Sequence, residues 1–199
     1  MRVLQFKNIV FLFFLIVIVC LVPIRSNKEN FKVVSVHASF NNNYHHVRND
    51  FNNMDDAANK MAQIKHNIKT LIDFLNKNYG TQKNVKNLIK RFDYDNIVEA
   101  THENDSTSYT INKGEEIHVC LRDKNQGTDL HDINTLMFVV LHEIAHIMSD
   151  SIGHNHEFKE NFKFVLNKAN DINLYHFINY QQHPSSYCGI KINSTPITF

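Results

Sequence analysis

The chain has 199 residues, room for one modest domain once its terminal segments are set aside. Its formal net charge is +1, so it lacks the strong positive field typical of DNA- and RNA-binding proteins, and no nucleic-acid partner is expected. The 13 histidines raise the chance that a histidine motif occurs without function, so such a motif needs support from its surroundings.

The first element is an uncharged apolar run, Asn8–Ile24, preceded by Arg2 and Lys7 and followed by Arg25. Its length is at the short end of the roughly 17–25 residues that cross a bilayer. A cleaved signal peptide has a shorter apolar core and a small-residue cleavage site, and the sequence offers no convincing one. Residues 1–25 therefore favour a single-pass N-terminal membrane anchor over a cleaved signal peptide, with the side of the membrane left open.

Residues 26–53 are polar and rich in asparagine, which predicts a tether with a short strand at Val33–Val36. Residues 54–199 have the patterns of a single folded domain. Apolar residues recur with helical spacing over Met54–Tyr79, Gly80 is a suitable C-terminal stop, and a second, shorter helix follows.

Short strand-like segments come next. Asn96–Ala100 and Ser108–Asn112 are two of them, and Ile117–Arg122 alternates most clearly between apolar and polar residues. A hairpin or meander is therefore expected just before the next helix. On the polar face of the last strand, His118 and Arg122 are candidates for substrate contact, against the simpler alternative of solvated side chains.

The segment Leu136–Phe158 contains the motif His-Glu-x-x-His within an apolar helical pattern, for which Asp132 is a suitable N-cap. On a helix, His142 and His146 lie on the same face, where both imidazoles can reach one zinc ion at Zn–N distances of about 2.0–2.1 Å. Glu143 is poorly placed as a ligand but can reach a water on the metal, as a general base does. The motif predicts a zinc-dependent peptidase with one zinc ion per chain.

A catalytic zinc ion needs a third protein ligand. An unbroken helix would carry residue 154 about 12 Å past His146, so the chain has to turn back, and Gly153 permits that turn because glycine readily adopts positive φ. His154 follows directly, and His156 is the competing ligand. Spacing alone leaves both open.

The run from His142 to His146, continued by Gly153-His154-x-x-Glu157-Phe158, resembles the HExxH…GHxxEF pattern of WLM and SprT-like zinc metallopeptidases. It is more similar still to uncharacterised WLM-type proteins of large DNA viruses, over a region from about Leu71 to Ile192. The resemblance implies an α+β, zincin-like fold: a small, mostly antiparallel sheet packed on the active-site helix, with flanking helices. It also implies that His154 is the third ligand. The gap before His154 is longer than in some WLM members, which leaves the substrate open.

The resemblance further implies an edge strand that pairs with an extended peptide or protein substrate, for which Ile117–Arg122 is the candidate. Tyr187 in the C-terminal tail is a candidate donor to the reaction's oxyanion, against the alternative of a core tyrosine. Cys120 and Cys188 are expected either to form a disulfide or to remain buried thiols.

Two other functions fit parts of the sequence. A membrane-tethered structural or interaction protein would have a zinc site closed by a fourth protein ligand, and His156 is the residue that can supply it. A DNA-associated protein-crosslink protease is suggested by the WLM and SprT-like resemblance. The near-neutral charge and the apolar N-terminal run disfavour that second alternative.

Overall fold

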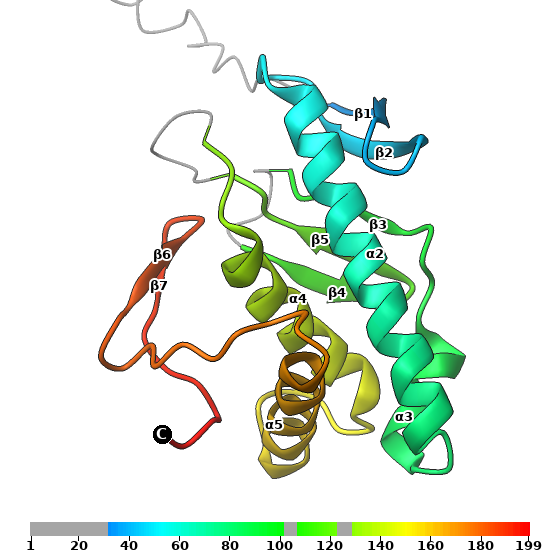
Figure 1. The fold of residues 1–199 in the computed structure, drawn as a ribbon, viewed down its shortest axis with the longest axis vertical. Coiled ribbons are helices and arrows are strands. Elements are labelled where there is room, and N and C mark those ends of the chain that lie inside the picture. The colour runs from blue at the N-terminus through cyan, green and yellow to red at the C-terminus, as the bar shows by residue number, and fades with distance from the viewer. Residues whose placement is uncertain (1–31, 102–106, 123–128) are drawn as a thin grey trace, which may run out of the picture. The chain divides into compact units, whose positions relative to one another are not determined.

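The computed structural model describes residues 32–101, 107–122 and 129–199 (Figure 1). Phe31–Phe199 forms one compact unit, and the structure below is that of this unit. Its described part holds four helices and seven strands in three small sheets, so the predicted α+β class is confirmed.

The predicted single-pass membrane localisation is contradicted. Within the described ranges, none of the helices combines the length and the apolar character that crossing a membrane requires. The segment that led to the prediction, Asn8–Ile24, lies outside the described residues.

The predicted tether is replaced in part by folded structure. Strands β1 (Val33–Ala38) and β2 (Asn43–Arg48) form an antiparallel hairpin that packs on helix α2 (Met54–Tyr79), and Ala38 and Val47 are fully buried. The asparagine-rich stretch between the strands is its turn, with Asn42 at φ +58°, a conformation that asparagine tolerates better than most residues. Asn41 and Asn42, two of the asparagines that suggested a tether, are therefore turn residues.

The three-stranded sheet has the order β3-β5-β4, and its strands pass behind helix α2 in Figure 1. Its strands are β3 (Ile97–Glu99), β4 (Tyr109–Ile111) and β5 (Glu116–Val119). β5 pairs in parallel with β3 and antiparallel with β4, so it is the central strand. The prediction that Ile117–Arg122 is the edge strand is wrong, because strand order depends on pairing partners that alternation within one strand does not specify. β4 is the edge strand that packs on helix α4 (Ile133–Met148), which carries the His-Glu-x-x-His motif.

Helix α4 (Ile133–Met148) is the centre of the unit. It packs against α5 (His156–Asp171), α3 (Lys83–Arg91) and the β4 and β5 strands (Figure 1). Most of its residues are buried, as expected for a helix that is apolar nearly all round. The predicted N-cap is confirmed: the Asp132 side chain accepts a hydrogen bond of 2.9 Å from the backbone N–H of Thr135.

A C-terminal hairpin, β6 (Ser185–Tyr187) and β7 (Ile190–Ile192), forms the last sheet. Its turn is joined to the end of β5 by a disulfide between Cys120 and Cys188, whose Cα atoms are 6.4 Å apart. The sequence left a disulfide and two free thiols open, and the structure has the disulfide.

Candidate metal centre

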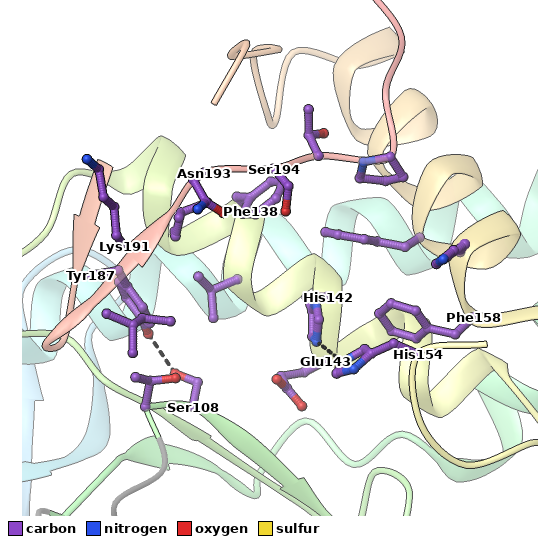
Figure 2. Close-up of a pocket in the computed structure, with 18 residues that line it drawn as sticks. Ser108, Phe138, His142, Glu143, His154, Phe158, Tyr187, Lys191, Asn193 and Ser194 are labelled. Carbon is purple, nitrogen blue, oxygen red and sulfur yellow. Dashed lines mark hydrogen bonds between the residues drawn. The ribbon is translucent and has the colours of Figure 1, made fainter. Parts of the chain in front are cut away.

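Three histidines meet at the C-terminal half of α4. The Nε2 atoms of His142 and His146 are 3.2 Å apart, and that of His154 lies 2.9 Å from the first and 3.2 Å from the second. His142 and His146 share one face of the helix. The chain turns back after α4 to bring His154 to them, and Figure 2 shows His154 beside His142. In the described parts of the chain, this cluster contains no fourth histidine, cysteine or carboxylate, and His156 is not a member.

The spacing of these nitrogens fits a tetrahedral metal ion. Zinc with Zn–N bonds of about 2.0–2.1 Å holds its nitrogen ligands about 3.3–3.4 Å apart. A neutral Nε2 either donates or accepts a hydrogen bond, so three Nε2 atoms facing one another cannot satisfy all three contacts at once. A cation bound by all three lone pairs removes that conflict.

Burial keeps the first two imidazoles in the neutral form that binds metal. It lowers the pKa of His142 to about 3, with added repulsion from His146 and His154. Burial also lowers the pKa of His146 to about 4, with repulsion from His154 and Lys113. Neutral imidazoles expose the lone pairs that metal binding requires.

Phe158 is the hydrophobic support of the cluster. Its ring centroid lies 4.8 Å from that of His142, 4.3 Å from that of His146 and 4.7 Å from that of His154. The phenylalanine of the Glu-Phe pair therefore contacts all three imidazoles and restricts their rotation.

The segment that carries the third histidine, residues 149–155, is called the ligand loop below. Gly153 has φ +81°, a conformation that L side chains rarely adopt, which confirms the predicted glycine turn. The Glu157 carboxylate accepts hydrogen bonds from the backbone N–H groups of Asp150 at 2.9 Å and Ser151 at 3.0 Å. Glu157 therefore holds the start of the ligand loop against the first turn of α5.

Glu143 lies beside the cluster and is almost fully buried. Burial raises the pKa of its carboxyl group to about 7, and a hydrogen bond from the Thr110 backbone N–H opposes part of that rise. Thr110 belongs to β4, so the edge strand contacts the carboxyl group directly. No side-chain pattern could have predicted this contact, because the donor is a backbone group.

A cavity of about 800 Å³ opens beside the histidines, and Glu143 lines it together with His142 and His154 (Figure 2). One side is formed by α4 and α5 and the other by the β6–β7 hairpin and the residues after it. Apolar side chains from both sides line it: Phe138, Val139, Phe158, Phe162, Ile190 and Ile192. The site therefore combines a possible metal centre, a buried carboxyl group and an apolar cavity.

Tyr187 lines the same cavity from the hairpin, but its side chain is fully buried (Figure 2). Its hydroxyl lies 2.6 Å from the Ser108 Oγ, and burial raises the pKa of the phenol above its usual value. The structure thus brings this candidate near the site while its hydroxyl is bonded to Ser108.

The two candidate substrate contacts lie outside the cavity. The His118 ring stacks on Tyr109 with centroids 4.6 Å apart, and its Nε2 lies 2.9 Å from the Glu116 carboxylate. Arg122 is buried, with its Nε 3.6 Å from the Glu99 carboxylate. The β5 strand is central, so these side chains contact their own sheet and the core.

The chain was compared with known proteins. It is 33% identical over 187 residues to the uncharacterized protein R325 of Acanthamoeba polyphaga mimivirus, covering 90% of this chain and 92% of that protein. The chain belongs to the same family as that viral protein. Another relative is the uncharacterized protein 136R of Invertebrate iridescent virus 6, 37% identical over 48% of this chain and 54% of its own length.

The uncharacterized protein 042R of Invertebrate iridescent virus 3 is 52% identical over 33% of this chain and 40% of its own length. The family is thus one of uncharacterised proteins from large DNA viruses, as the sequence predicted. No protein-family model and no solved structure matches the chain.

Proposed function

We propose that this protein is a zinc-dependent metallopeptidase of the zincin type, with one zinc ion held by His142, His146 and His154. The observation that carries the proposal is the convergence of the three Nε2 atoms, 2.9–3.2 Å apart, beside a buried carboxyl group in an open cavity. The resemblance of the motif to WLM and SprT-like peptidases agrees with it.

Zinc, when bound, supplies a Lewis acid that acidifies water and polarises the scissile carbonyl group. Glu143 accepts the proton of the attacking water and later transfers it to the leaving amine. Burial raises the pKa of this carboxyl group in the metal-free protein to about 7, and a bound cation would lower it toward the carboxylate form that accepts the proton. The Thr110 N–H holds the carboxyl group in position for this transfer.

The substrate in this proposal is an extended segment of a peptide or protein. It pairs with the edge strand β4, Tyr109–Ile111, in place of the central strand predicted from the sequence. The neighbouring cavity, with Phe138 and Val139 on one side and Ile190 and Ile192 on the other, accepts an apolar side chain. Tyr187 remains a candidate oxyanion donor, and this role requires its hydroxyl to leave Ser108.

A structural zinc site is the second candidate function. Such a site is normally closed by four protein ligands. Among the described residues the cluster has three, and His156, the proposed fourth ligand, is outside it, which favours a site with one position open for water. A role in DNA-crosslink proteolysis has no specific observation in its favour.

Metal analysis and the Glu143→Gln variant test the proposal together. We expect one zinc ion per chain in both proteins. We also expect peptide hydrolysis to fall by about 10²–10⁴-fold in the variant, because the general base is removed while the three imidazoles remain. Absence of stoichiometric zinc would overturn the proposal. Zinc-loaded wild type that cleaves no member of a broad peptide library would favour the structural site.

A further inference from the structure

The ligand loop, residues 149–155, has one large apolar side chain, Ile152, which is 89% exposed, yet the loop sets the position of His154. Polar groups from outside α4 and α5 hold its backbone. We propose that Lys113, assisted by Arg91, is a positioning residue for the third metal ligand and thereby sets the affinity of the site for zinc. This inference rests on the proposed function, and its test separates the two.

Lys113 binds three consecutive carbonyl groups at the start of the loop. Its Nζ donates to the Ser149 carbonyl at 3.0 Å and to the Ser151 carbonyl at 3.2 Å, and it also contacts the Asp150 carbonyl between them. An ammonium group has three N–H donors, so these contacts use its whole capacity. One side chain therefore orients three successive peptide units that lead from His146 toward His154.

Arg91, at the end of α3, extends this contact to the end of α4. One guanidinium nitrogen donates to the carbonyls of Ile147 and Ser149, both at 2.9 Å, and the other lies 2.7 Å from the Asp150 carboxylate. The C-terminal carbonyls of a helix carry partial negative charge, so two cations here stabilise the end of the helix that bears His146.

The backbone N–H groups of the same segment are also hydrogen-bonded. Glu157 accepts from the N–H groups of Asp150 and Ser151. The loop backbone is thus bound by cations on its carbonyl side and by an anion on its amide side. That arrangement leaves little freedom for the chain segment that delivers His154.

The turn that presents Lys113 is itself in unfavourable backbone conformations. Asn112 and Lys113 have φ +46° and +57°, in the left-handed region that favours glycine. A Cβ atom on Gly114, at φ +114°, would lie 2.9 Å from the Arg91 carbonyl oxygen and 3.1 Å from the Ile147 side chain. The turn therefore packs tightly against α3 and α4, and this packing fixes the position of Lys113 relative to the ligand loop.

The β4 strand, which precedes this turn, also donates the Thr110 N–H to Glu143. One hairpin, β4 with its turn and β5, therefore contacts both the general base and the backbone that carries the third ligand. If Lys113 only capped the end of α4, there would be no reason for the same hairpin to contact Glu143 as well. The pair of contacts therefore favours a role in the metal site.

The test measures zinc affinity by competition with a chromophoric chelator, and the Co²⁺ absorption spectrum, on the full chain. Lys113→Met keeps the side-chain stem and removes the donors. We expect it to bind zinc about 10–100-fold more weakly, the usual effect of losing a partner that orients a ligand, and to alter the Co²⁺ spectrum. Lys113→Arg should restore most of the affinity. Arg91→Lys keeps the charge and should lose less zinc affinity than Lys113→Met. It replaces Lys113→Met as the test variant if that protein does not fold.

Lys168→Met is the matched control, because Lys168 is also partly buried and pairs with Asp171 away from the cluster. Its zinc affinity should stay within twofold of wild type. Unchanged affinity and spectrum in Lys113→Met, or an equal loss in Lys168→Met, would overturn this inference alone. Failure of the wild type to bind zinc would overturn the proposed function, and this inference with it.

Discussion

The two sides of the cavity are held in different ways. The ligand wall, made of α4, the ligand loop and α5, is stabilised by a continuous set of hydrogen bonds and ring contacts around the three histidines. The hairpin wall, residues 185–196, is attached through Tyr187, bonded to Ser108, and through the Cys120–Cys188 disulfide.

The difference lies in how far apart in sequence the partners are. His142 and Phe158 belong to one short stretch of chain, whereas the disulfide joins residues 68 apart and Tyr187 contacts a residue 79 positions away. The three imidazoles and Phe158 of the ligand wall thus come from one short stretch of chain, which Lys113 and Arg91 hold from a distance, while the hairpin wall is attached through long-range links alone. We expect changes in the first to alter metal binding and changes in the second to alter substrate binding.

The largest expected effect comes from removing the third imidazole from the ligand wall. His154→Ala should weaken zinc binding by more than the roughly 10–100-fold typical of an outer-shell partner, because it removes a direct ligand. His156→Ala, two residues away and outside the cluster, should leave the affinity nearly unchanged. Chelator competition measures both, and equal losses would show that the ligand assignment is wrong.

The next effect comes from opening the hairpin wall. The double variant Cys120→Ser/Cys188→Ser should lose about 2–4 kcal/mol of unfolding free energy, since the disulfide no longer restricts the unfolded chain. Zinc affinity should stay within about twofold, while KM for a cleaved peptide rises more than kcat falls.

Chemical denaturation, metal competition and steady-state kinetics measure these three quantities. A large loss of zinc affinity in the double variant would contradict the separation of the two walls. The single variant Cys20→Ser, changed outside Phe31–Phe199, is the control for cysteine substitution as such.

The smallest expected effect is a pH dependence that arises in the ligand wall. The pKa values of His142 and His146 are lowered to about 3 and about 4, below the ordinary 6.5, so the unfolded chain binds more protons than the folded one between these limits. The raised pKa of Glu143, about 7, opposes part of this effect between pH 4.5 and 7, because the folded chain keeps that proton. Since two histidines outweigh one carboxyl group, the stability of the metal-free protein should be highest near pH 7 and fall as the pH drops toward 4. On the hairpin wall, the raised pKa of Tyr187 leaves it uncharged throughout this range.

Denaturation of metal-free protein at several pH values measures this dependence. His142→Gln should flatten it, because one of the groups that must take up a proton is removed. His45, in the β1–β2 hairpin, also has its pKa lowered to about 4, so some dependence should persist in that variant. An unchanged slope in His142→Gln would exclude His142 as a source of the dependence.

Local sequence determined the parts of this protein whose physics is confined to one element. The i,i+4 spacing of His142 and His146, the Asp132 cap and the positive φ at Gly153 each follow from helix geometry or from the properties of a single residue type. The α+β class was expected from the resemblance to WLM and SprT-like peptidases, and the structure has that class.

Only the tertiary structure decided which strand is the edge, where Arg122 lies and how Cys120 and Cys188 pair. It also brought His154, and not His156, to the other two imidazoles, a choice that spacing left open. Strand order, burial and disulfide pairing depend on residues distant in sequence, so no local pattern contains them. The His-Glu-x-x-His part of the site is therefore encoded locally, whereas the third ligand and the shape of the cavity depend on how segments meet in space.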